Sequence, residues 1–125
     1  MKRSLFLAML LLLPASPALA TGGFDCRATD GSGIALSGAV GRVVGNPLVT
    51  SHLRLGERTL STTGAEPALV IARSWLDAER IWVDLADPRL SRFEAQLRVR
   101  VGANWTATGN LVRGGRTHPV RCEVE

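Results

Sequence analysis

The chain has 125 residues, a formal net charge of +4 at pH 7 and two cysteines. Two of its positive charges, Lys2 and Arg3, lie in a leader-like start. Without them the net charge is +2, which gives no strong preference for nucleic acid. The remaining length suits one domain with a single core, and no long stretch after the leader has helical spacing.

Residues 1–20 have the pattern of a signal peptide. A basic start precedes an apolar run at 5–13 that is short for a membrane span, and small residues stand at the −3 and −1 positions of a cleavage site after Ala20. We therefore predict that 1–20 is cleaved and that a single β domain, 21–125, is exported to the periplasm or secreted, without spanning the membrane. The alternative is an uncleaved anchor.

The first two hairpins are predicted from glycine turns. A three-residue loop at 31–33 matches the apolar sides of its strands, and Gly38 and Gly41 predict a bend or bulge in the second strand. A two-residue turn at 56–57, with glycine first, joins the next pair of strands. The predicted opposite pairs are Ala28 with Leu36, Phe24 with Val40, and Leu53 with Leu60.

A four-residue loop at 77–80 predicts the third hairpin, which carries two tryptophans. The pairs predicted to face the core are Leu76 with Ile81, Ser74 with Val83, and Ala72 with Leu85. The pairs predicted on the opposite face are Trp75 with Trp82 and Arg73 with Asp84. This loop length therefore places both indoles outside the core.

Residues 92–101 give the clearest strand, because apolar and polar side chains alternate along the whole stretch. A three-residue loop at 102–104 and a Gly-Gly turn at 114–115 continue the meander. The pairs predicted across the first turn are Val101 with Trp105, Val99 with Ala107, and Leu97 with Gly109. Those predicted across the second are Leu111 with His118, Gly109 with Val120, and Ala107 with Cys122.

Cys26 and Cys122 fall on the inward side of the first and last strands, which predicts one disulfide in an exported protein. Closing a loop of this length is worth about 4–5 kcal/mol in the chain-entropy model. A redox or metal pair is the alternative, but there is no CxxC and no zinc-ligand spacing to a histidine. We predict an all-β fold, a small antiparallel barrel or sandwich of eight to nine short strands closed by the disulfide, and we favour the barrel.

The first candidate site lies on the outer face of the tryptophan hairpin. Its residues are Arg73, Trp75, Trp82 and Asp84. Exposed tryptophan beside a cross-strand ion pair is typical of a contact surface, for sugar stacking or for a protein partner. The alternative is that a loop or strand covers both indoles as a satellite core.

The second candidate is an anion patch made of Arg98, Arg100 and Arg121. Arg98, Thr108 and Arg121 are predicted to line up across three adjacent strands, where they would bind phosphates or carboxylates. Glu94 and Glu123 partly neutralise this face, and Trp105 is predicted to face the core. The alternative is a solvated arginine-rich face.

Neither catalysis nor a metal or cofactor site is predicted. His52 and His118 have no nucleophile tied to them by a known local pattern, and turn regions are ordinarily rich in the acids seen here. The glycine turn at 31–33 leads into a strand, whereas a dinucleotide loop leads into a helix. Asn104 begins a glycosylation acceptor triplet, which suggests an exposed turn.

The cysteine placement resembles that of small exported β-barrels that inhibit lysozymes, which also carry cysteines near both chain ends. The resemblance is one of architecture. The sequence has no tyrosine and hence none of the serine-glycine-tyrosine type motifs of those inhibitors. A basic chain is also a poor electrostatic match to a basic lysozyme. We do not assign the chain to that group.

These observations predict an exported, non-catalytic binding or interaction module, whose partner would be an envelope or extracellular protein or a glycan. Specific nucleic-acid binding is not expected. One alternative is a barrel that holds a small apolar molecule, which needs a cavity of roughly a few hundred Å³ instead of an interior filled by Phe93 and Trp105. The other is a hydrolase, which needs His52 or His118 beside a carboxylate and a nucleophile in one cleft.

Overall fold

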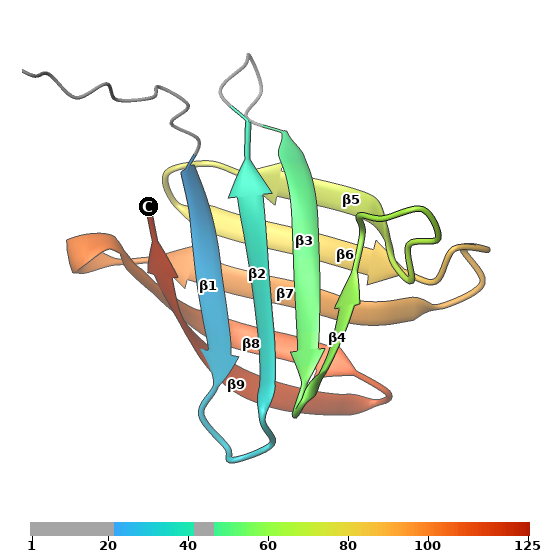
Figure 1. Ribbon diagram of the computed structural model, residues 1–125. Coiled ribbons are helices and arrows are strands. Elements are labelled where there is room, and N and C mark those ends of the chain that lie inside the picture. The colour runs from blue at the N-terminus through green and yellow to red at the C-terminus, as the bar shows by residue number, and fades with distance from the viewer. Residues whose placement is uncertain (1–21, 42–46) are drawn as a thin grey trace, which may run out of the picture.

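The protein is an antiparallel sheet curved into a half barrel, as Figure 1 shows. The structure is a computed structural model that describes residues 22–41 and 47–125. Those ranges contain a short 3-10 turn, η1 (Ala103–Trp105), and no α-helix. The nine strands are β1 (Gly22–Ala28), β2 (Ile34–Val40), β3 (Leu48–Leu55), β4 (Arg58–Ser61), β5 (Val70–Leu76), β6 (Arg80–Ala86), β7 (Phe93–Val101), β8 (Thr106–Arg113) and β9 (Arg116–Val124).

The strand order is β4-β3-β2-β1-β9-β8-β7-β6-β5. Apart from β4 and β5, consecutive strands pair with each other, and the first strand pairs with the last, as a barrel requires. Among the described strands, the ring stays open between β4 and β5, although β3 and β5 approach each other across the opening. In Figure 1, β1 to β4 run steeply in front and β5 to β8 cross behind them, so the sheet folds over its own core. The all-β, barrel-like prediction is confirmed.

The predicted disulfide joins the first strand to the last. Cys26 lies directly opposite Cys122 in the β1–β9 ladder, the two sulfurs are bonded, and both residues are fully buried. Because β1 and β9 are neighbours at the centre of the sheet, the bond ties the meander β1–β4 to the meander β5–β9. It closes a separation of 96 residues, a long loop in chain-entropy terms.

The core is aliphatic. Alternate side chains of almost every strand point into the fold, and six leucines are fully or almost fully buried: Leu36, Leu53, Leu69, Leu85, Leu97 and Leu111. Phe24 is also buried, and it lies across from Gly38 of β2. A Cβ on Gly38 would stand 2.6 Å from the Phe24 ring, so glycine is needed there to make room for the aromatic side chain.

Three predicted hairpin turns are confirmed. Gly56 has positive φ in the two-residue turn that sets Leu53 opposite Leu60. Gly114 and Gly115 have positive φ in the β8–β9 turn, and the three pairs predicted across that turn are observed. The β5–β6 loop sets the two tryptophans opposite each other, as predicted.

Two predicted registers were wrong by two residues, which preserves the inward face. In the first hairpin, Cys26 lies opposite Leu36, because the loop is longer than the three residues predicted: the last β1–β2 pair is Arg27 with Ala35. In the β7–β8 hairpin, Leu97 lies opposite Leu111, because the loop includes Trp105 as well. A shift of two keeps each side chain on its side of the sheet.

Two aromatic residues predicted to fill the interior are outside it. Trp105 has a left-handed backbone, φ 57°, and is 71% exposed in the β7–β8 loop. Phe93 lies beyond a bulge in the β6–β7 ladder and is 46% exposed, with the Arg73 guanidinium 6.0 Å from its ring centre. A second bulge, near Ala72, sets Ile71 opposite Leu85 in place of Ala72. Bulges shift which residue faces inward, and alternation alone does not reveal them.

The described ranges hold no helix that is long and apolar enough to cross a membrane. The predicted signal peptide, 1–20, lies outside the described residues, and export stays a prediction. The disulfide itself is compatible with an oxidising, exported environment.

Removing the disulfide should destabilise the protein strongly. We expect Cys122→Ser to lower the free energy of unfolding by about 2–5 kcal/mol and the melting temperature by roughly 10 °C or more. Thermal unfolding followed by circular dichroism measures this change. Wild-type protein unfolded with a reducing agent is the control and should melt like the variant; equal melting of oxidised wild type and variant would rule out a structural role for the bond.

Candidate functional site

The predicted tryptophan site lies on the outer face of β5 and β6, and β7 extends it. The registers place Arg73 opposite Asp84, Trp75 opposite Trp82, and Trp82 opposite Arg98 of β7. Trp75 is 59% exposed and Trp82 is 42% exposed. The alternative in which both indoles form a covered satellite core therefore does not describe this face.

Asp84 is the buried anchor of this surface. Its carboxylate accepts hydrogen bonds from Arg73 Nε at 2.9 Å and from Gln96 Nε2 at 3.3 Å, and Arg98 Nη1 lies 2.9 Å from Oδ1. Burial would raise the pKa of Asp84, but the hydrogen bonds from Arg98 and Arg73 outweigh it and hold that pKa below its ordinary value. The carboxylate is thus occupied by its neighbours, and it positions two guanidinium groups.

Trp82 is held by two arginines. The Arg80 and Arg98 guanidinium carbons lie 5.3 and 5.4 Å from the centre of its ring, within the range of a cation–π interaction. Because Trp82 is only partly buried, these two contacts help to fix the orientation of its indole. Trp82 is therefore held in place on the surface by its two arginine contacts.

Trp75 is fixed through its ring nitrogen. Nε1 donates to Asp77 Oδ2 at 2.8 Å, and Asp77 Oδ1 accepts the backbone N–H groups of Glu79 and Arg80 at 2.8 Å each. The same bonds, that from Trp75 first, lower the pKa of Asp77. Asp77 thus bonds both to the backbone of its own hairpin loop and to the exposed indole of Trp75, which it holds in place.

Two cavities flank Trp82. One, of about 390 Å³, is lined by Arg73, Ser74, Trp75, Trp82, Asp84 and Arg98. The other, of about 400 Å³, is lined by Arg80, Trp82, Arg98, Val99, Arg100, Thr108 and Gly109. The structure thus brings together the four residues of the first candidate site and adds Arg80 and Arg98, whose contacts with Trp82 depend on the β6–β7 register.

The predicted alignment of the anion patch was wrong in one respect. Arg98 lies opposite Asn110, while Arg100 lies opposite Thr108 and Thr108 opposite Arg121. The register error in the β7–β8 hairpin explains the difference. Arg98 consequently belongs with Asp84 and Trp82, and the row across the strands is Arg100, Thr108 and Arg121.

The two histidines lie apart from this face and from each other. His118 Nδ1 lies 2.7 Å from Asp30 Oδ2, and only 9% of its side chain is exposed. Hydrogen bonds from Ser32 and His118 lower the pKa of Asp30 to about 2. This contact anchors the β1–β2 loop to β9. His52 is exposed on β3 and lines a separate cavity of about 240 Å³.

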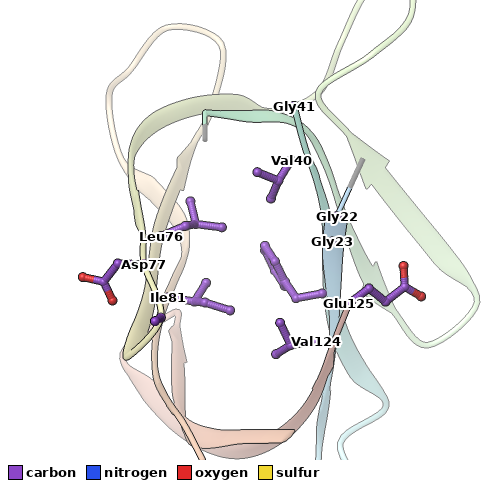
Figure 2. A pocket seen from close by; sticks show the side chains of 11 residues that line it. Gly22, Gly23, Val40, Gly41, Leu76, Asp77, Ile81, Val124 and Glu125 are labelled. Atoms are coloured by element: carbon purple, nitrogen blue, oxygen red, sulfur yellow. The ribbon is translucent and has the colours of Figure 1, made fainter. Parts of the chain in front are cut away.

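Another cavity opens at one end of the half barrel. Figure 2 shows Val40, Leu76, Ile81 and Val124 pointing into it from opposite walls, while Asp77 and Glu125 point away. Its volume is about 330 Å³, and Phe24 and three glycines complete the lining together with Ala78.

In comparisons by sequence and by structure, no family model, no curated protein and no solved structure matches the chain. Within residues 22–41 and 47–125, no three His, Cys, Asp or Glu side chains gather in a way that could hold a metal ion. Any functional argument therefore depends on the surfaces themselves.

Neutralising Asp84 should weaken the fold in a pH-dependent way. We expect Asp84→Asn to lower the free energy of unfolding at pH 7 by about 1–3 kcal/mol, because it removes hydrogen bonds to charged partners. Since the folded pKa of Asp84 is lowered, its contribution is present above the ordinary pKa and is lost as the pH falls through the folded pKa. The difference between wild type and variant should accordingly shrink below about pH 4.

Urea unfolding at neutral and acid pH measures this effect. Asp25→Asn is the matched control, because Asp25 is half exposed and its ion pair with Arg27, at 3.3 Å, is solvent-exposed. The control should change stability little at either pH. A variant at Asp84 that is as stable as wild type at pH 7 would contradict the anchoring role.

Proposed function

We propose that the protein is an exported, non-catalytic binding module that docks a partner on the outer face of β5 to β7. The observation that carries this proposal is the state of its two tryptophans. Trp75 is 59% and Trp82 42% exposed, yet each is held by specific contacts: Trp75 by Asp77, and Trp82 by the flanking arginines. Rigid exposed aromatic residues beside arginines are the usual anchors of binding surfaces.

The rigidity matters because binding is costly when side chains must be ordered first. Asp77 and Asp84 bind their neighbours in the free protein and so remove part of that cost. The surface therefore presents aromatic and guanidinium groups in a fixed arrangement. A purely structural role for the indoles would favour their burial, since aromatic side chains stabilise most when removed from water.

Replacing both indoles should remove binding and spare the fold. We expect Trp75→Ala/Trp82→Ala to melt within a few degrees of wild type and to lose capture of the partner from an envelope fraction. The matched control is Trp105→Ala, because Trp105 is exposed as well, at 71%, but lies in the β7–β8 loop. Capture must persist in the control. Capture by the double variant, or its unfolding, would contradict the proposal.

A second candidate function is the binding of a small apolar molecule. The end cavity favours it, because its inward side chains are apolar and its volume of about 330 Å³ lies within the range of ligand pockets. On this account the half barrel would hold a hydrophobic ligand between β1–β2 and β5–β6. The tryptophan face would then have no part in binding.

Filling the cavity tests this second function. We expect Val124→Trp to abolish binding of a fluorescent apolar probe such as 1-aminoanthracene, because the larger side chain occupies the space. Val112→Trp is the control, since Val112 is exposed on β8 away from the cavity. Equal probe binding by the two variants would contradict an end-cavity site.

A further inference from the structure

The cavity beside Trp82 on the β7 side has an unusual lining. Its lining includes Trp82, Thr108 and three arginines and contains no carboxylate; of the arginines, Arg98 is already paired with Asp84, which leaves Arg80 and Arg100 as the cationic groups available to a ligand. We name these residues the arginine cradle: Arg80, Arg98, Arg100 and Thr108. Guanidinium groups and hydroxyls are the donors that recognise carboxylate, sulfate and phosphate oxygens.

The register brings like charges together in the cradle. Arg80 lies directly opposite Arg100 in the β6–β7 ladder, and like charges in that position destabilise a sheet. Within the described ranges, Arg100 forms no ion pair, and Arg80 reaches only the exposed Glu79, at 3.9 Å. A bound anion would relieve this repulsion.

The cradle adjoins the tryptophan surface. Both flanking cavities share Trp82 and Arg98, so the binding face is continuous from Trp75 to Thr108. Because neighbouring strands lie about 4.8 Å apart, the face spans roughly 14 Å from β5 to β8. That length exceeds one sugar ring and suits an oligomer.

Trp75 supplies the apolar part of the face. Its indole is exposed and fixed, and the negative π face of an aromatic ring attracts the partly positive C–H groups on the flat side of a pyranose. Trp82, by contrast, is already contacted by two guanidinium groups. The face therefore offers one stacking platform followed by a cluster of positive charges.

We infer that the docking face binds an acidic glycan, with a sugar ring on Trp75 and a carboxylate or sulfate in the arginine cradle. This inference rests on the proposed function and names the class of its partner. A single-stranded nucleic acid fits less well, because stacking of successive bases needs several free aromatic faces along a basic groove. Charge complementarity with the cradle also disfavours a neutral glycan.

Defined oligosaccharides test the inference. The probes are an oligogalacturonate hexamer, a heparin-derived hexasaccharide, neutral cellohexaose and a single-stranded hexathymidylate, each titrated into the wild-type protein at about 50 and 200 mM salt. Intrinsic tryptophan fluorescence or calorimetry reports binding. We expect at least one acidic hexasaccharide to bind about tenfold or more tightly than cellohexaose and hexathymidylate, and to weaken as salt rises.

Two variants and one control locate the site. Arg100→Gln should weaken acidic-glycan binding about tenfold, and Trp75→Ala should weaken it as well. Arg89→Gln removes the same charge from an exposed loop between β6 and β7, so it should change affinity less than about twofold. Equal losses for Arg89→Gln and Arg100→Gln would reduce the effect to net charge and overturn the inference.

The remaining outcomes separate this inference from the proposed function. If no acidic glycan binds, or if cellohexaose or hexathymidylate binds as tightly, the acidic-glycan assignment is overturned. Should partner capture nevertheless depend on Trp75 and Trp82, the docking face stands with a partner of another class. If capture does not depend on them, the proposed function falls too.

Discussion

The pairing of β1 with β9 is the constraint on which the rest of the structure depends. The ring of strands is open between β4 and β5, so among the described strands this ladder alone joins the two meanders edge to edge. It is also among the most non-local contacts of the chain, and such contacts carry a large loop-closure cost. The buried Cys26–Cys122 bond lies at this point and removes that freedom from the unfolded chain as well.

The residues on the outer face of the sheet are those that alternate with the buried core residues. Aliphatic side chains, mostly leucine and valine, fill the inside of the half barrel, and the alternate positions carry arginines, threonines and tryptophans. These outer side chains stabilise one another: Asp84 binds two arginines, and two arginines contact Trp82. The packing of the core therefore determines which side chains of β5 to β7 face outward. Contacts among those outward side chains then determine the shape of the proposed docking face.

Much of this architecture can be read from the sequence because a β-strand has a period of two. A register error of two residues, as in the first hairpin and the β7–β8 hairpin, leaves every side chain on its proper face. The inward positions of Cys26, Leu97 and Val120 and the outward positions of Trp75 and Trp82 could therefore be predicted, even where strand partners were wrong. Turns with glycine at positive φ gave the β3–β4 and β8–β9 registers, and loop length gave that of the β5–β6 hairpin.

The features that could not be predicted depend on loops, bulges and side-chain reach. The left-handed Trp105 and the bulge beside Phe93 turned two aromatic residues outward, although aromatic residues ordinarily belong to cores. The contacts of Arg80 and Arg98 with Trp82 required the β6–β7 register, which alternation alone does not set. The end cavity is likewise a property of how the curved sheet packs, and its residues come from five separated parts of the chain.

The central claim, that the first strand lies beside the last with Cys26 facing Cys122, can be measured directly in solution by nuclear Overhauser effects. With their Cα atoms 3.9 Å apart, the two Hα protons should give a strong cross-strand signal, and the β1 amides should be protected from hydrogen exchange. Absence of that signal, together with β1 amides that exchange as fast as those of the loops, would contradict the account.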